Sequence, residues 1–132
     1  MIDEILELKK RCNFGDEIGQ TFNLTLGEVS CLSIIARHKT LSSKNLSALM
    51  ELSPSRGSRV ISRLSHRGFI VGRSDESDRR YLLLTLTEAG KKCDLVIQKE
   101  KKNYEERILA KLTNEQKSTV INGRFLFIGE LC

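Results

Sequence analysis

Apolar residues recur every three or four positions through most of this chain, which is the spacing of one face of an α-helix. Between residues 69 and 86 the pattern changes to two runs of β-branched or bulky apolar residues separated by a polar stretch. We predict an imperfect first helix near residues 2–12, further helices over residues 26–38, 43–50, 54–67, 88–112 and 114–131, and a β-hairpin with a charged tip. The expected fold class is mainly α (α+β).

Capping signals mark where three of these helices begin. Thr25 precedes Glu28 by three residues, and Thr113 precedes Gln116 by three, so each pair can satisfy backbone N–H groups as a capping box. Ser53-Pro54 supplies a cap oxygen followed by proline at the first helical position, where the missing N–H costs nothing. The starts of these three helices therefore follow from a few identifiable residues.

A tight joint at Glu51-Leu52 separates the helix over residues 43–50 from the helix over residues 54–67, and Gly68 ends the second. Two short helices joined in this way form a helix-turn-helix. Because the predicted hairpin follows them directly, it would serve as a wing. The segment therefore predicts a winged helix-turn-helix.

The second helix of this pair carries one basic side. Between residues 53 and 80 the chain has seven arginines, three acidic residues and no lysine. Four of the arginines share one side of the helix: Arg56, Arg59, Arg63 and Arg67. The planar fork of arginine can bond guanine or a phosphate with two hydrogen bonds. On an arbitrary helix a solvated arginine face is the better interpretation, but the second helix of a helix-turn-helix is the one that fits the major groove.

The opposite side of the same helix is small and apolar. Gly57, Ile61 and Leu64 are expected to pack inward, with Val60 at the edge. Glycine inside a helix costs about 1 kcal/mol relative to alanine. We therefore interpret Gly57 as the site of a close backbone approach to the preceding helix.

The predicted hairpin tip carries Asp78, Arg79 and Arg80, where a wing would reach the adjacent minor groove. Narrow A·T-rich minor grooves attract inserted arginine, and Arg80 is the candidate. Phosphate would repel Asp78, so this carboxylate is predicted to orient a neighbouring arginine through a charge-assisted hydrogen bond. An ordinary exposed turn acid is the alternative interpretation of Asp78.

Composition limits the other classes of function. The chain has 132 residues, which suits one domain, and a net charge of +5, which favours a polyanionic partner. No apolar stretch is long enough to span a membrane, and residues 1–10 lack the apolar run of a secretory signal, so we expect a cytoplasmic protein with no membrane partner. There is no Gly-rich phosphate loop, nucleophile elbow or His–acid pair with catalytic spacing. We therefore expect no enzyme activity, no catalytic residue and no cofactor.

Several short motifs carry a resemblance to a known family. In order along the chain they are Leu24-Thr25, Leu52-Ser53-Pro54-Ser55, Arg63-Leu64, Gly68-Phe69-Ile70, Asp78-Arg79-Arg80 and Leu86-Thr87-Glu88-Ala89-Gly90. In this order and spacing they resemble the MarR family of winged helix-turn-helix transcriptional regulators, over about residues 20–131. The segment from Asp78 to Gly90 is the most specific part. The short, glycine-containing first helix and Gly57 depart from the family pattern.

The resemblance implies a homodimer that docks two winged domains on a pseudo-palindromic operator in double-stranded DNA. The unpartnered apolar stripes of the first and the last two predicted helices independently favour a second subunit. The implied plan is a single MarR-type domain over residues 1–132, with a winged helix-turn-helix DNA-binding part at 24–90 and a helical dimerisation part at 1–23 and 91–132. Members usually repress transcription, and many are released by a small-molecule effector or an oxidant.

The residues expected to contact DNA are Ser53, Ser55, Arg56, Ser58, Arg59, Arg63, Arg73, Asp78, Arg79 and Arg80. Arg56, Arg59 and the nearby serines are assigned to base edges or adjoining phosphates. Arg63 and Arg73 are assigned to the DNA backbone, and Arg80 to the minor groove with Asp78 as its companion. The expected function is a sequence-specific DNA-binding transcriptional regulator, a repressor released by a small-molecule effector.

Two alternatives stay open. Some relatives sense peroxides through a cysteine in the first helix, so Cys12 is the candidate for a thiol-based redox switch, with burial as a small apolar residue as its other interpretation. Cys31 and Cys93 fall on or near apolar faces and are predicted to be core residues, and with two histidines in the chain a tetrahedral zinc site is hard to assemble, so we expect no metal. The second alternative is a winged-helix module that binds a protein, with an incidental basic face.

Overall fold

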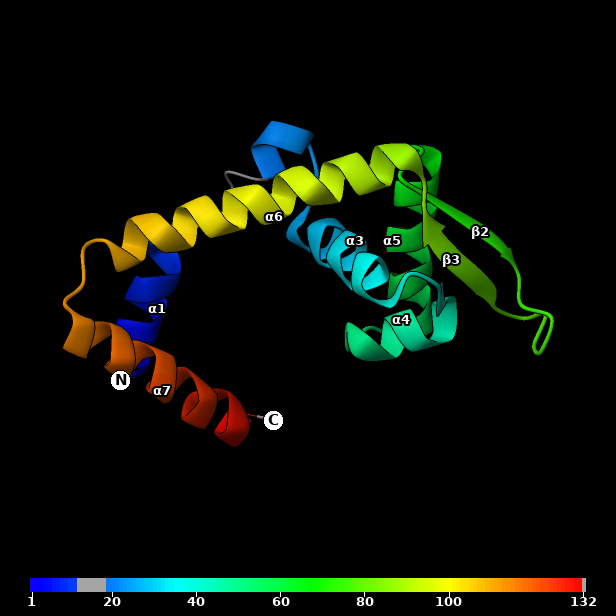
Figure 1. Cartoon of the computed structure of the whole chain (residues 1–132). Helices are drawn as coiled ribbons and strands as arrows, with labels where there is room; N and C mark the ends of the chain where they lie inside the picture. The colour runs from blue at the N-terminus through cyan, green and yellow to red at the C-terminus, as the bar shows by residue number, and fades with distance from the viewer. Residues whose placement is uncertain (12–18, 132) are drawn as a thin grey trace. The chain divides into compact units, whose positions relative to one another are not determined.

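The computed structural model of this chain describes residues 1–11 and 19–131, with the backbone alone at residues 5, 8–11 and 124–131. The chain is mostly helical with one small sheet, as the pattern predicted (Figure 1). The helices are α1 (Ile2–Arg11), α3 (Leu26–His38), α4 (Ser43–Leu49), α5 (Pro54–His66), α6 (Glu88–Leu109) and α7 (Asn114–Leu131). The strands are β1 (Leu41–Ser42), β2 (Ile70–Ser74) and β3 (Leu82–Leu86).

The helices begin where the capping residues predicted. Thr25 and Glu28 form the reciprocal capping box of α3, in which the Thr25 N–H donates to the Glu28 carboxylate at 2.9 Å and the Glu28 N–H donates to the Thr25 hydroxyl at 3.2 Å. Thr113 and Gln116 form the same pair of bonds at the start of α7. Both predicted boxes are confirmed.

The sheet is antiparallel with strand order β1-β3-β2. The hairpin of β2 and β3 was predicted, and its register pairs Ile70 with Leu86 and Ser74 with Leu82. Strand β1 was not predicted, because two residues are too few to show the alternation of a strand. The Ser42 hydroxyl in β1 also accepts the Asn45 N–H and caps α4, so the strand and the helix start share one residue.

A single apolar core lies under the helix-turn-helix and the sheet. Its fully buried side chains come from five elements: Leu32 and Ile35 in α3, Leu46 in α4, Leu64 in α5, Leu84 in β3 and Ile97 in α6. Each element contributes few such residues, so the orientation of α5 depends on packing from all the others.

The beginning of α6 differs from the expectation of helical spacing. Counting back from Cys93 and Ile97, the apolar stripe of this helix predicts a buried Ala89, but Ala89 is exposed and Gly90 is buried in its place. A side chain at Gly90 would collide with the Phe69 carbonyl oxygen, so the missing side chain lets α6 touch the start of the wing. The helix also ends at Leu109, three residues before the predicted end.

Contacts divide the chain into two compact units, Met1–Gln98 and Lys99–Cys132, with the boundary inside α6. The first unit contains α3, α4, α5 and the whole sheet. None of the helices in the described part of the chain is long and apolar enough to cross a membrane.

Candidate nucleic-acid interface

Helix α5 is held in place at both ends by the residues that the sequence singled out. The Ser53 hydroxyl accepts the Arg56 N–H at 3.4 Å, and Pro54 occupies the first helical position. Gly68, with φ of +77°, ends the segment in the left-handed conformation that glycine favours. The helix therefore starts and stops for local reasons before any tertiary contact is made.

One side of α5 packs and the other is open, as predicted. Gly57, Ile61 and Leu64 are buried, whereas Arg56 and Arg59 are exposed. A Cβ atom at Gly57 would collide with the Ser47 hydroxyl of α4, which confirms the interpretation of this glycine as a close approach between the two helices. The approach fixes α5 against α4 and aims its basic side at solvent.

The four arginines of that side are not equivalent. Arg67 donates hydrogen bonds to the Asn23 carbonyl and, at 2.8 Å, to the Phe22 carbonyl, so it ties the turn before α3 to the end of α5. The Arg63 guanidinium lies 3.6 Å from the Glu28 carboxylate, and Glu28 is almost fully buried while Arg63 is half exposed. The sequence identified Glu28 only as a capping residue, and nothing in the spacing linked it to α5.

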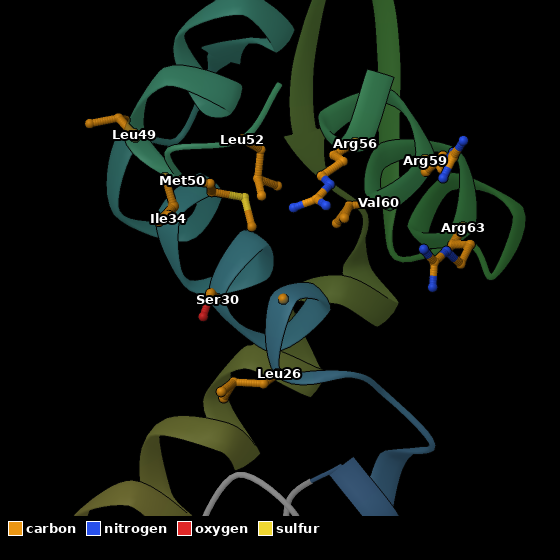
Figure 2. Close-up of a pocket in the computed structure, with 11 residues that line it drawn as sticks. Leu26, Ser30, Ile34, Leu49, Met50, Leu52, Arg56, Arg59, Val60 and Arg63 are labelled. Atoms are coloured by element: carbon orange, nitrogen blue, oxygen red, sulfur yellow. The ribbon is translucent and has the colours of Figure 1, made fainter. Parts of the chain in front are cut away.

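Arg56 and Arg59 have no acidic partner among the described residues. They stand beside a groove of about 670 Å³ between α3, the α4–α5 link and α5. Figure 2 shows Arg56, Arg59 and Arg63 projecting from α5, with Leu26, Ser30 and Ile34 on α3. This part of α5 therefore presents unneutralised positive charge next to an apolar wall.

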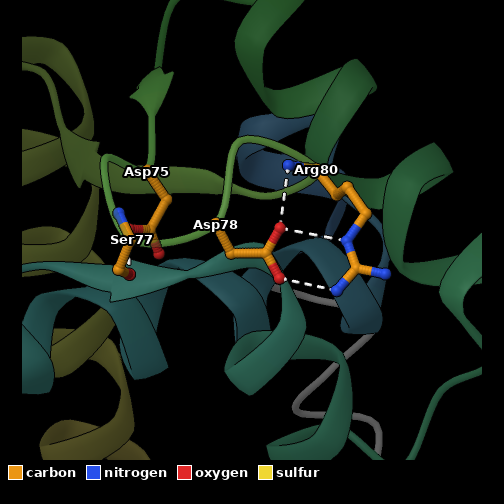
Figure 3. Close-up of polar contacts among 4 residues, drawn as sticks. All are labelled: Asp75, Ser77, Asp78 and Arg80. Atoms are coloured by element: carbon orange, nitrogen blue, oxygen red, sulfur yellow. Dashed lines mark hydrogen bonds and ion pairs between the residues drawn. The ribbon is translucent and has the colours of Figure 1, made fainter.

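The loop that joins β2 to β3 forms the tip of the hairpin (Figure 1). Within it the Asp78 carboxylate accepts three hydrogen bonds from Arg80, from the backbone N–H at 3.1 Å and from the guanidinium at 3.0 and 2.8 Å (Figure 3). The prediction that Asp78 orients a neighbouring arginine is confirmed. The bidentate pair holds the exposed Arg80 side chain in one direction.

The remaining predicted residues lie around these two features. Ser53, Ser55 and Ser58 are exposed on the first turns of α5, and the Ser53 and Ser55 hydroxyls are 3.3 Å apart. Arg73 is exposed on β2, and Arg79 is exposed at the hairpin tip. Cys12 lies outside the described residues.

The cysteines that the structure describes are core residues, as predicted. Cys31 and Cys93 are free and buried. Burial, with a smaller contribution from the Glu28 charge, raises the pKa of the Cys31 thiol to about 12. Burial also raises the pKa of Cys93. Within residues 1–11 and 19–131, no group of three or more His, Cys, Asp and Glu side chains is arranged to hold a metal ion.

The Asp78–Arg80 pair makes a prediction that a titration can check. Hydrogen bonds from the Arg80 guanidinium and backbone N–H lower the pKa of Asp78 from 3.8 to about 2. Because the pKa of Asp78 is lowered in the folded state, the Asp78–Arg80 ion pair is fully formed at a pH above the ordinary pKa of 3.8 and is lost as the pH falls through about 2. Carboxyl chemical shifts should give Asp78 a midpoint of about 2, rising toward 3.8 in Arg80→Gln.

Asp75 is the internal control for that titration. Its pKa is lowered by the Ser77 hydroxyl and backbone N–H, which bond the Asp75 carboxylate at 2.6 and 3.0 Å. Arg80→Gln should therefore move the Asp75 midpoint much less than the Asp78 midpoint, because Asp78 is among the smaller influences on the pKa of Asp75. An Asp78 midpoint that does not move in the variant would mean that Arg80 does not hold this carboxylate in solution.

The site as a whole is a helix-turn-helix whose second helix exposes arginines, followed by a wing with a fixed arginine. The family model of the MarR family matches residues 24–82, which run from two residues before α3 to the first residue of β3. Over these residues the chain matches the MarR family. A curated relative of the chain is YwhA of Bacillus subtilis, an uncharacterized HTH-type transcriptional regulator that is 29% identical over 90 residues. The match covers 68% of this chain and 65% of YwhA.

Solved structures confirm the winged-helix fold of this chain. FabT of Streptococcus pneumoniae in complex with DNA matches with a TM-score of 0.83 at 17% identity, covering 99% of this chain and 97% of FabT. A cysteine-to-serine mutant of MarR from E. coli, complexed with operator DNA, matches with a TM-score of 0.79 at 16% identity, covering 99% of this chain and 91% of that one. The predicted architecture and the predicted resemblance to the MarR family are both confirmed.

Proposed function

We propose that the protein is a sequence-specific DNA-binding transcriptional regulator that acts as a homodimer. The observation that carries the proposal is the basic side of α5, where Arg56 and Arg59 stand exposed with no acidic partner among the described residues. An arginine left without a protein partner is free to bond base edges or phosphates. The second helix of a helix-turn-helix is the element that enters the major groove.

The roles of the individual residues are part of the proposal. Arg56 and Arg59 contact base edges, helped by the exposed hydroxyls of Ser53, Ser55 and Ser58. Arg73 and Arg79 contact phosphates from the wing, and Arg80, held by Asp78, enters the minor groove. Arg63 contacts the DNA backbone and keeps Glu28 as its protein partner, so its charge is partly neutralised in the free protein.

Exposed apolar side chains outside the core support the homodimer. Seven of the exposed large apolar side chains lie on α1, α6 and α7: Ile2, Leu6, Leu95, Val96, Ile108, Val120 and Ile121. Leu95 is 69% exposed and Val120 is 55% exposed, which is unfavourable for a monomer in water. In this proposal residues 24–90 bind DNA, and residues 1–23 and 91–132 form the dimer.

Two finer points rest on the family. We propose that the regulator is a cytoplasmic repressor, not an enzyme, and that a small-molecule effector releases it from DNA. A thiol-based switch at Cys12 is the alternative form of release. The two described thiols do not favour redox sensing, because burial raises the pKa of Cys31 and Cys93 and disfavours the reactive thiolate.

Selection from a random-sequence duplex library tests the proposed function. The expected result is one enriched inverted repeat with half-sites about one helical turn apart, bound by two chains. At near-physiological salt this duplex should bind at least about 10³-fold more tightly than a scrambled duplex of the same length. Equal affinity for the two duplexes would contradict sequence-specific binding and favour the protein-interaction module.

A further inference from the structure

A hollow of about 370 Å³ lies where the helix-turn-helix meets the loop between β2 and β3. Its lining includes Ser43 and Lys44 from α4, Ser58 from α5, and Arg80 and Tyr81 from the hairpin loop. Lys44 and Tyr81 are far apart in the sequence and were not predicted to contact DNA. The fold alone brings them together.

The hollow carries a local excess of positive charge. The Lys44 ammonium nitrogen lies 5.7 Å from the centre of the Tyr81 ring, and the Arg80 guanidinium carbon lies 5.6 Å from the same centre. Hydrogen bonds from Arg80 and, less strongly, the charges of both cations lower the pKa of Asp78, and the Asp78 carboxylate is already bonded by Arg80. Lys44 therefore has no acidic side chain of its own among the residues that the structure describes.

Hydroxyl groups add hydrogen-bond donors to the same place. The Ser58 side chain is exposed at the second turn of α5, and its hydroxyl makes no hydrogen bond with the residues that the structure describes. The Ser43 hydroxyl accepts the Leu82 N–H at 3.1 Å, which keeps its own hydrogen available to a ligand. An ammonium group beside two hydroxyl donors is chemistry that suits a phosphate oxygen.

The position of the hollow indicates that the bound phosphate belongs to the DNA backbone. If α5 enters the major groove and the wing enters the adjacent minor groove, the sugar–phosphate backbone that separates the two grooves must pass between α5 and the wing. The hollow lies in that gap.

We propose that this hollow binds one backbone phosphate of DNA, with Lys44 as the cation that neutralises it and Tyr81 as the ring against which Lys44 is held. This inference rests on the proposed function and adds a contact to it. Because a phosphate contact carries no sequence information, Lys44 sets affinity and register but not base preference.

Lys44→Gln tests the proposal, with Lys92→Gln as the matched control. Lys92 is exposed on α6, outside the hollow, and its replacement removes the same charge. Affinity is measured over a range of salt concentrations for the selected duplex and for a scrambled one. Lys44→Gln should lower the salt slope by about 0.9 and weaken both duplexes equally, by about fivefold at near-physiological salt. Lys92→Gln should match the wild type.

Tyrosine fluorescence reports on the hollow directly, because the chain has two tyrosines and no tryptophan. In a Tyr104→Phe background Tyr81 is the only tyrosine. Duplex DNA should change its emission, and Lys44→Gln should reduce that change, while inorganic phosphate at constant ionic strength should have no effect. A response to inorganic phosphate together with an unchanged DNA affinity in Lys44→Gln would overturn the proposal and assign a free-anion site.

These measurements distinguish a failure of the phosphate site from a failure of the proposed function. If the wild type prefers the selected duplex and Lys44→Gln keeps the wild-type salt slope, the proposed phosphate site is wrong, but the proposed function as a sequence-specific regulator is supported. If the wild type shows no preference between duplexes, the proposed function itself fails.

Discussion

Replacing Arg56 and Arg59 together with alanine is expected to remove most of the preference for the selected duplex. Neither side chain packs in the core or pairs with an acid in the described part of the chain, so their positive charge remains available to DNA. Two bidentate contacts to base edges contribute about 2–6 kcal/mol of discrimination. Titration of the selected and scrambled duplexes with the double variant should give nearly equal affinities. The free energy of unfolding measured with urea should differ from that of the wild type by no more than about 0.5 kcal/mol.

The control for this experiment is the double variant Arg37→Ala with Lys92→Ala. Both residues are exposed in the first compact unit, on α3 and α6, and their loss lowers the net charge by the same amount. This control variant should bind both duplexes modestly less tightly and should keep the preference for the selected duplex. If the control loses as much discrimination as Arg56→Ala with Arg59→Ala, binding depends on total charge and not on the face of α5.

Gly90→Ala is expected to destabilise the fold by about 1–3 kcal/mol. A Cβ atom here would collide with the Phe69 carbonyl oxygen, which is backbone and cannot rotate away. The same oxygen accepts the Thr87 N–H at 3.0 Å, so a shift also loosens the joint between the wing and α6. Overpacking costs about 1–3 kcal/mol and a lost hydrogen bond about 1 kcal/mol, against about 1 kcal/mol gained in helix propensity.

Gly27→Ala provides the comparison of opposite sign. Gly27 lies in the first turn of α3, and its nearest neighbour to a new Cβ atom would be the Thr25 hydroxyl at an ordinary 3.9 Å. With helix propensity as the main effect, this variant should be as stable as the wild type or more stable. Urea unfolding followed by far-UV circular dichroism measures the free energy of unfolding of Gly90→Ala and of Gly27→Ala. A Gly90→Ala protein as stable as the wild type would show that α6 does not press on the wing.

Local signals in the sequence were enough to predict much of this architecture. A capping box needs two residues three positions apart, and Thr25 with Glu28 supplied both bonds that the structure contains. A helical face needs only the helical repeat, which placed Gly57 on the inner side of α5 and Arg56 on the outer side. The Asp78–Arg80 pair is also local, because its two residues are neighbours in one turn.

Contacts between distant segments could not be predicted in the same way. Arg63 and Glu28 are far apart in sequence, and each already had a sufficient local explanation, as a basic-face residue and as a helix cap. Arg67 looked like its neighbours on the helical repeat but is held by the Phe22 and Asn23 carbonyls. The approach of Lys44 to Tyr81 depends on how the wing folds back beside α4, which no periodicity encodes.

Dimethyl sulfate probing of the selected duplex shows whether α5 and the wing lie in its two grooves. The reagent methylates guanine N7 in the major groove and adenine N3 in the minor groove, so one reaction reports on both α5 and the wing. We predict that guanines in each half-site are protected and that this protection is lost in the double variant Arg56→Ala with Arg59→Ala. Adenines beside each half-site should also be protected, and that protection should be lost in Arg80→Ala. Unaltered methylation of both grooves under saturating protein would contradict the account, because α5 and the wing would then not be in the DNA.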